Sequence, residues 1–372
     1  MAGMQIDTVQ RRLETLHEDD VPGFVNGLSV SAPSSLPSGA SPFDDPVLRG
    51  QGLSQSPASK ALDRTFDKNF GKDFNHAADK DAAPRNSFGA LETSRFKVWT
   101  AGSVIFGGVQ VSSLGVVSKT YFTLAGLTAG VDTQLMDGLR GGFAMSYSGE
   151  GADIGADGSR MNSKGLTGSL YGSWRVAGKF FLDGTMGYGD LSFSTKRFDA
   201  NAGDFIMGQR RGKMVFGSLA LTYDEKMGPL KFSPYARLDV IDATLNAYTE
   251  AGDPNWVLAY DTAGLGSRSL VLGLRGQYDF EQPWGVISPT WRVEYRRMLS
   301  GELTQMMTYA SDPSTAYNLT ARGSDRDTLS TALGLKAKTR GDVATTLEYL
   351  LGGGLKSGIQ SQGMRGMVKI GF

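Results

Sequence analysis

The stretch Met364-Arg-Gly-Met-Val-Lys-Ile-Gly-Phe372 is the part of the sequence that decides its fold. Apolar or small residues take every second position, and the positions between them include Arg365 and Lys369. Residues two positions apart share one face of a β-strand. The segment is therefore predicted to be a strand with one apolar face and one partly basic face, and it finishes on an aromatic side chain.

This ending can be interpreted in two ways. It fits an ordinary half-buried final strand, and it also resembles the C-terminal signal of bacterial outer-membrane β-barrels. In the second interpretation Phe372, Ile370 and Val368 form the assembly signal and face lipid, while Arg365 and Lys369 face the lumen. The pattern of the rest of the chain distinguishes between these two interpretations.

Composition excludes several classes of protein. The 372 residues hold 38 Lys and Arg against 38 Asp and Glu, so there is no net charge to favour a nucleic-acid partner. The chain has no cysteine, which excludes disulfides and suits passage through an oxidising periplasm. No apolar run approaches the roughly 20 residues of a transmembrane helix, so any membrane span must be a barrel. The 50 glycines fit strands that bend or approach closely.

The region before residue 95 is predicted to contain two helices and a linker. Residues 5–18 have the spacing of a short amphipathic helix, and residues 22–57 are rich in Pro, Ser and Gly, which predicts a flexible linker that completes a first segment, 1–57. Residues 58–94 form a second segment, a candidate pore helix or plug. Its apolar stripe consists of Leu62, Phe66, Phe70 and Phe74, which could equally pack against another helix. Residues 1–16 have no signal-peptide pattern, which taken alone indicates the cytoplasm. Because the rest of the chain indicates a barrel, we expect instead a longer precursor with its export signal upstream.

From residue 95 to 372 the hydrophobic period becomes two. Tight turns are predicted at residues 136–138, 176–179, 226–229, 282–285 and 339–342, and longer polar segments at residues 149–162, 196–210, 249–268 and 300–325. About twelve strands of roughly ten or more residues result, which is the length of a tilted membrane-spanning strand. An even number of strands leaves both termini of the barrel region on the side of the short turns. In outer-membrane barrels this side is periplasmic, and the long loops are extracellular.

Charge is confined to one face of these strands. Trp291, Val293 and Tyr295 alternate with Arg292, Glu294 and Arg296, for example. A soluble sandwich also alternates, but long strands paired as hairpins favour an antiparallel transmembrane β-barrel, because charges facing hydrocarbon are costly. The predicted lumen-facing residues are Arg237, Asp239, Arg275, Asp279, Arg292, Glu294, Arg296 and Glu348, which we expect to form salt-bridge networks or to guide an unfolded polypeptide.

Seven stretches along this region resemble one family. They are Phe96-Lys-Val-Trp-Thr-Ala-Gly-Ser103, Gly126-Leu-Thr-Ala-Gly-Val-Asp132, Ser169-Leu-Tyr-Gly-Ser-Trp174, Phe232-Ser-Pro-Tyr-Ala-Arg-Leu-Asp239, Ala247-Tyr-Thr-Glu250, Arg292-Val-Glu-Tyr-Arg296 and Lys369-Ile-Gly-Phe372. They resemble the translocator domain of autotransporters, the type V secretion proteins of Gram-negative bacteria. The resemblance implies an outer-membrane barrel with a helical segment in its pore, which exports and anchors an N-terminal passenger.

The resemblance also implies partners. These are outer-membrane lipid, the barrel assembly machinery, periplasmic chaperones and the chain's own passenger, with the barrel itself monomeric. The residues before 95 lack the β-solenoid repeats of a typical passenger, so the passenger is expected upstream. The pore-helix region shows no Asn-Asn pair of the kind that some members cleave.

Enzyme chemistry is not predicted. His17 and His76 are the only histidines, and both are interpreted as solvated imidazoles on helix surfaces. No nucleophile elbow, phosphate loop or zinc-helix motif is present, so we expect no catalytic residue, cofactor or metal site. Two functions remain: an autotransporter translocator, or a porin-like or other outer-membrane barrel (a channel or a surface adhesin) with a soluble N-terminal extension.

Overall fold

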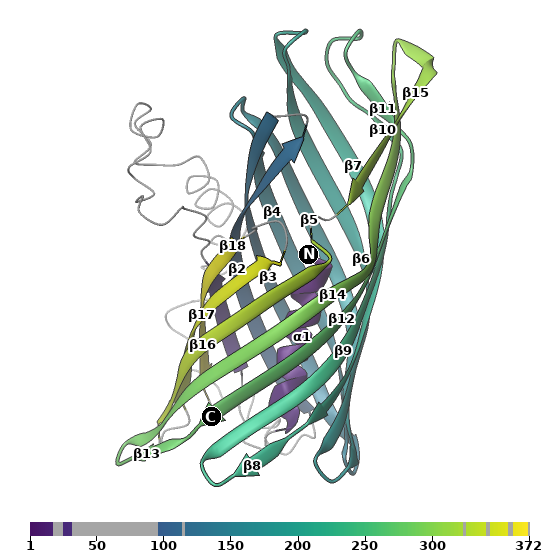
Figure 1. The fold of residues 1–372 in the computed structure, drawn as a ribbon. Helices are drawn as coiled ribbons and strands as arrows, with labels where there is room; N and C mark the ends of the chain where they lie inside the picture. Colours follow the sequence, from purple (N-terminus) through teal and green to yellow (C-terminus); the bar gives the residue numbers. More distant parts are fainter. Residues whose placement is uncertain are drawn as a thin grey trace, which may run out of the picture. The chain divides into compact units, whose positions relative to one another are not determined.

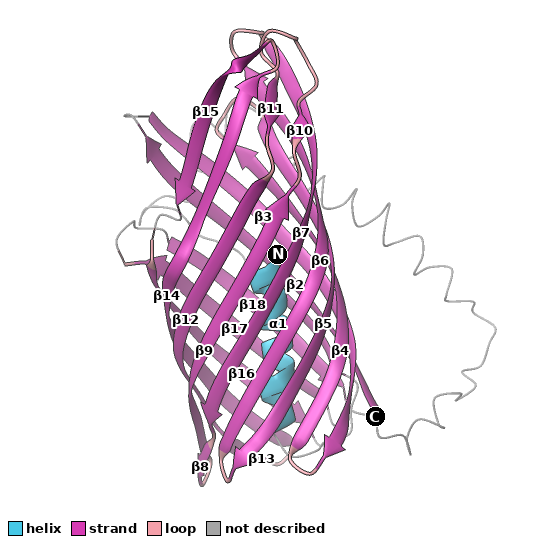
Figure 2. Cartoon of the chain, turned by 90° about the vertical axis from the view of Figure 1, so that its right-hand side faces the viewer, coloured by secondary structure: helices cyan, strands magenta, loops and turns pink. Residues whose placement is uncertain are grey.

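The computed structural model describes residues 1–17, 25–31, 96–113, 116–322, 325–339, 343–355 and 360–370. In this part of the chain, long tilted strands surround a single helix, α1 (Ala2–His17). Figure 1 shows the helix inside the ring of strands, and Figure 2 shows the same arrangement from the side. None of the described helices is long and apolar enough to cross a membrane.

Twelve of the described strands pair antiparallel, each with the next, to form the wall. They are β2 (Phe96–Ser113), β3 (Val116–Met136), β4 (Leu139–Ile154), β5 (Ser159–Ala177), β6 (Phe180–Asp199), β7 (Asp204–Tyr223), β9 (Leu230–Leu245), β12 (Ala263–Tyr278), β14 (Gly285–Tyr309), β16 (Asp327–Thr339), β17 (Val343–Gly354) and β18 (Gln360–Ile370). The predicted antiparallel barrel is confirmed.

The sheet closes where β18 comes next to β2, as expected for the final strand. β17 and β18 pair from Val343 opposite Ile370 to Gly353 opposite Gln360. Gly371 and Phe372 lie outside the described residues. A short strand that the sequence did not predict, β1 (Val25–Ser31), pairs in parallel with β2 at this seam and lies beside β18. A strand edge presents unpaired backbone groups, which explains why a segment interpreted as linker becomes a strand here.

The alternation of exposed and buried side chains follows the period of two. On β7, Val215, Leu219 and Leu221 are 57%, 52% and 50% exposed, whereas Phe216 and Ala220 are buried. Large apolar side chains cover the outer face of many other strands: Leu127, Leu166, Leu170, Leu238, Leu272, Leu274, Leu333, Leu335 and Leu347. An outer surface of this kind is unfavourable in water and matches the apolar band of a transmembrane barrel.

The two ends of the barrel differ. At one end, called the short-turn end, tight turns occur at residues 137–138, 178–179, 228–229 and 283–284, as predicted, and Gly138 and Gly178 adopt the positive φ angles that such turns need (76° and 52°). The fifth predicted turn, at 339–342, lies largely outside the described residues. The short strands β8 (Glu225–Met227) and β13 (Phe280–Gln282) belong to this end.

At the other end, called the hairpin end, the polar segments interpreted as loops are mostly strands. β4 and β5 continue to a turn at residues 155–158, and β6 and β7 to a turn at 200–203. Three further strands build this end: β10 (Tyr248–Thr249), β11 (Leu258–Tyr260) and β15 (Asp312–Arg322). Backbone pairing continues past the apolar band because exposed hairpins satisfy their own hydrogen bonds.

Aromatic rings explain part of the high glycine content. The Phe216 ring lies over Gly187 on the neighbouring strand, where an added Cβ would come within 2.2 Å of it. The Tyr235 ring lies over Gly273 in the same way, again at 2.2 Å. Glycine at these positions lets a large inward-facing ring lie flat on the wall, and the lumen keeps room for α1.

Candidate functional site

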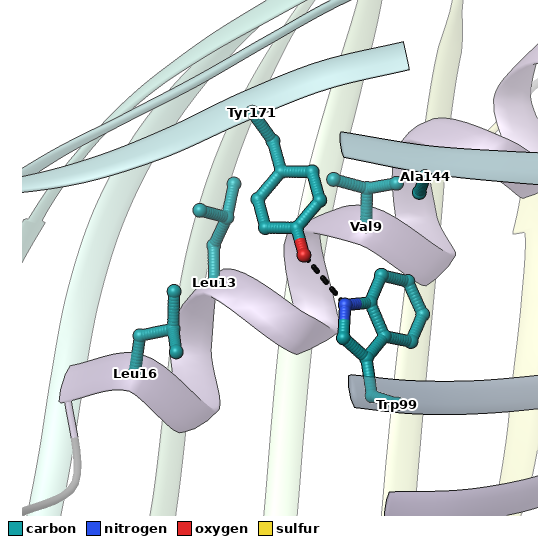
Figure 3. Packing of buried hydrophobic residues seen from close by; sticks show 6 residues of the cluster. All are labelled: Val9, Leu13, Leu16, Trp99, Ala144 and Tyr171. Carbon is teal, nitrogen blue, oxygen red and sulfur yellow. Dashed lines mark hydrogen bonds between the residues drawn. The ribbon is translucent and has the colours of Figure 1, made fainter. Parts of the chain in front are cut away.

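The interior of the barrel, with α1 in it, is the candidate functional site. One apolar face of the helix, formed by Val9, Leu13 and Leu16, packs against Trp99 of β2, Ala144 of β4 and Tyr171 of β5. Figure 3 shows Val9 and Leu13 beside the two rings and Leu16 further along the helix. The rings meet edge to face, with 5.9 Å between their centroids. This cluster fixes the C-terminal half of α1 against the wall.

A second apolar cluster fixes the N-terminal half. Ala2 and Ile6 pack with Leu191, Met214, Phe216 and Ala243 of the wall. The Met4 side chain fills the space over Gly126, where an added Cβ would lie 2.3 Å from its Cε. The helix therefore contacts the wall along its whole length, on the side of strands β3 to β7.

A buried ion pair joins α1 to β3. The Nε and Nη2 atoms of Arg12 donate hydrogen bonds to the two carboxylate oxygens of Asp132 at 2.8 and 2.9 Å. Tyr171 donates its hydroxyl to the same carboxylate at 2.9 Å, and Trp99 donates its indole N–H to the Tyr171 oxygen at 2.5 Å. Only 7% of the Arg12 side chain and 2% of the Asp132 side chain are exposed. A bidentate guanidinium–carboxylate pair is the strongest form of this contact.

A second pairing crosses to the opposite wall. Glu14 accepts from Arg275 of β12 at 2.6 Å and from Arg292 of β14 at 2.7 Å. Arg292 also donates to the Tyr235 hydroxyl at 3.1 Å, and Tyr235 donates to Glu294. One helix carboxylate thus bridges two wall guanidinium groups and reduces their mutual repulsion in the lumen.

The last residue of α1 forms a third contact, close to the short-turn end. The two ring nitrogens of His17 lie 2.9 Å from Asp183 of β6 and 2.9 Å from Asp224, and the ring stacks on Phe181 at 4.0 Å between centroids. His17 and Asp224 both lie outside the membrane-crossing strands. Burial lowers the pKa of His17, but hydrogen bonds and charges from Asp183 and Asp224 outweigh it and raise this pKa above 6.5. The interpretation of His17 as a solvated imidazole was wrong, because two carboxylates distant in sequence enclose it.

The remaining side of α1 is polar and loosely packed. Asp7 pairs with Arg237 at 3.1 Å and Arg11 with Glu348 at 3.6 Å. A cavity of about 200 Å³ lies here between the helix and strands β14, β16 and β17, and its lining includes Glu14 and Arg292. Long charged side chains bridge this gap, so α1 occupies the lumen without filling it.

The structure places the predicted lumen residues as follows. Arg237, Arg275, Arg292 and Glu348 contact α1 directly. Arg296 and Arg237 both pair with Asp239, at 3.0 Å each, and Glu294 lies 3.5 Å from Arg292. Asp279 accepts from Gln277 and Ser288 instead, away from α1. Leu62, Phe66, Phe70 and Phe74 lie outside the described residues, and so does Phe372. In the described part of the chain, no group of His, Cys, Asp or Glu could hold a metal ion.

The model of one protein family, described as the autotransporter beta-domain, matches residues 98–350. The chain belongs to the autotransporter β-domain family. It is an outer-membrane translocator barrel, a type of domain that works with a passenger domain. No curated protein sequence matches the chain.

Solved structures of autotransporter barrels are similar in fold. The translocator domain of the autotransporter NalP from Neisseria meningitidis is 13% identical with a TM-score of 0.56, and the match covers 85% of this chain and 98% of that one. The β domain of the Bordetella autotransporter BrkA is 14% identical with a TM-score of 0.51, covering 75% and 100%. The transport unit of the autotransporter AIDA-I from Escherichia coli is 13% identical with a TM-score of 0.50, covering 82% and 98%.

Several residues of this translocator's interior were missed in the sequence. Asp132 and Tyr171 lie within stretches that carried the family resemblance, but nothing in those stretches marked them as partners of a helix more than 100 residues away. Asp183 shares its strand face with Phe181 and Thr185, so the sequence did not indicate a charged face here. Charge on the helix residues Asp7, Arg12 and Glu14, which all find lumenal partners, was the usable signal.

Raising the pH should weaken the docking of the C-terminal end of α1. Because the folded-state pKa of His17 is raised, its stabilising contribution is complete below pH 6.5 and is lost as pH rises through the raised pKa. Brief channel openings in a planar bilayer should therefore become more frequent as the pH is raised through the pKa of His17, which lies above 6.5.

The control for this prediction is His17→Gln, which keeps a hydrogen-bonding side chain but cannot titrate. Its openings should not change over the same range. The groups that face His17 are Asp183, Asp224 and Arg275, whose Nη2 lies 3.5 Å from the His17 ring. An unchanged pH dependence in the glutamine variant would assign the effect to a different group.

Proposed function

We propose that this chain exports and anchors an N-terminal passenger, and that α1 is the segment that occupies the lumen once transport has finished. The observation that carries the proposal is the matching of charges along α1. Asp7, Arg11, Arg12, Glu14 and His17 each face an oppositely charged wall residue. A porin-like channel has no need of such a helix, so the match favours the translocator. The pore-helix role that the sequence suggested for residues 58–94 passes, in this proposal, to α1.

The direction of α1 supports an orientation for the barrel. The N-terminus lies about halfway along the lumen, and the helix runs from there to the short-turn end, where His17 meets Asp224. A passenger joined ahead of α1 would leave through the hairpin end. We therefore propose that the hairpin end is extracellular and that the short turns and both barrel termini are periplasmic, as is usual for outer-membrane barrels.

The proposal includes the route of assembly. The chain would cross the periplasm with chaperones, and the barrel assembly machinery would insert it as a monomer, using Val368, Ile370 and Phe372 as the signal. The lumen is lined by ion pairs and hydrogen bonds that hold α1, which supports a conduit. We propose that the domain has no enzymatic activity of its own.

A surface-display experiment tests this function. A signal peptide and a small folded reporter are fused ahead of Met1, and the fusion is expressed in a Gram-negative host. Protease added to intact cells should remove the reporter and leave the barrel in the outer membrane. A reporter that stays protected, although the barrel is inserted, would contradict export through this barrel.

Deleting Phe372 from the same fusion separates assembly from folding. The amount of barrel in the outer membrane, and with it the displayed reporter, should fall severalfold, while refolding of the purified chain in detergent changes little. Equal losses in both assays would mean that Phe372 acts only through packing.

A further inference from the structure

The outer face of strands β5, β6 and β7 changes from apolar to charged within one step of the alternation. The outward-facing residues Leu166, Tyr188 and Val215 are 51%, 47% and 57% exposed. The next outward positions toward the hairpin end are Lys164 on β5, Asp190 on β6 and Lys213 on β7, and all three are exposed. This boundary marks the edge of the apolar band, which is the depth at which lipid head groups lie.

Three cations gather at this edge, and we call Lys164, Arg211 and Lys213 the basic patch. Lys164 and Arg211 both lie opposite Ser192 in the strand register, one on each side of it. Neighbouring strands are about 4.8 Å apart, so their Cα atoms are separated by roughly 10 Å, which two long side chains can close onto one group. Asp190 lies directly opposite Lys213 in the register, and this one carboxylate beside three cations leaves the basic patch with an excess of positive charge.

Other outward-facing arginines have carboxylate partners. Arg268 makes two hydrogen bonds to Asp242 at 2.9 and 2.8 Å, and Arg297 lies 3.5 Å from Asp327. No side chain among the described residues forms an ion pair or hydrogen bond with Lys164 or Arg211. Unpaired cations at the edge of the apolar band are therefore a local feature of β5 to β7. At this depth, an anionic group of a membrane lipid can neutralise their charge.

We propose that the basic patch binds the phosphate of a phosphorylated glycolipid head group in the outer leaflet. A phosphate between Lys164 and Arg211 would accept two hydrogen bonds from the guanidinium group and one from the ammonium group, and Ser192 lies below it with a hydroxyl to donate. The acyl chains of the same lipid would lie on Leu166, Tyr188 and Val215. The choice of leaflet rests on the proposed orientation, in which the hairpin end is extracellular.

Native mass spectrometry of the full chain in detergent tests the proposal. Three probes are offered separately: a bisphosphorylated glucosamine-disaccharide lipid, the same lipid with its phosphates removed, and phosphatidylglycerol. The phosphorylated glycolipid should be retained best, and Lys164→Gln with Arg211→Gln should reduce its retention roughly tenfold. The matched control, Arg268→Gln, removes an outward arginine that already has a partner and should leave retention unchanged.

Three outcomes would overturn the proposal. They are equal retention by the double variant and the native chain, equal retention of the dephosphorylated lipid, and equal retention of phosphatidylglycerol, which would make the patch a general anion site. Both substitutions are on the exposed outer face, so the folded barrel of the variant should resist heat as well as the native barrel does. This measurement checks that the variant folds. The lipid assay needs no passenger, whereas orientation and export are decided by the reporter assay, so the two proposals can fail separately.

Discussion

Deleting residues 2–17 should convert the barrel from a closed state into a stable open channel. The twelve wall strands hold one another through backbone pairing, so the ring does not need α1 to stay closed on itself. Among the described residues, α1 is the segment inside the lumen, and its removal exposes Asp132, Asp183, Arg275 and Arg292 to water. In a planar bilayer the native chain should give rare, brief openings, and the deleted chain should give long openings of large conductance.

The matched control is deletion of residues 58–94, the segment that the sequence first suggested as a plug. That chain keeps α1 with all its wall contacts and should remain closed. Long openings after deletion of 58–94 together with closure after deletion of 2–17 would reverse the assignment. If the native chain already gave a conductance as large as that of the chain lacking residues 2–17, the porin-like alternative would be favoured instead.

The strands of the wall were predictable from the sequence because every residue that faces lipid has to be apolar. A residue such as Leu219 or Leu272 must be apolar if it meets hydrocarbon, so apolar side chains recur at every second position of strands such as β7 and β12. Turn positions such as Gly138 were readable for a similar reason, since a tight turn needs a positive φ angle. Both signals are local, and they are repeated from hairpin to hairpin.

The interior was less predictable because its contacts are between residues far apart in sequence. The stripe of Phe66, Phe70 and Phe74 is as amphipathic as residues 2–17, and periodicity alone does not say which segment enters the lumen. Which segment enters the lumen is determined by pairs such as Arg12 with Asp132 and Glu14 with Arg292, which are 120 and 278 residues apart. Only a three-dimensional arrangement shows that these charges match.

Replacing Asp132 by Ala should release α1 more strongly than any other single substitution in the wall. Arg12 would keep its charge in a site where only 7% of its side chain is exposed, and Tyr171 would lose its acceptor. Breaking one partner of a buried ion pair costs about 3–5 kcal/mol, which lowers a docking equilibrium constant by a factor of roughly 100 or more. The open probability in a planar bilayer should rise accordingly, while the strand content of the barrel stays unchanged.

Two comparisons show whether burial of the pair is the cause. Exchanging the residues, Arg12→Asp with Asp132→Arg, restores opposite charges and should recover most of the closed state. The outer pair Arg268–Asp242 has nearly the same two distances, 2.9 and 2.8 Å, but its side chains are 42% and 53% exposed, so Asp242→Ala should cost no more than about 1 kcal/mol and should not open the channel. If Asp132→Ala and Asp242→Ala behave alike, water in the lumen screens the inner pair, and the apolar contacts of Val9 and Leu13 with Trp99 must then hold the helix instead.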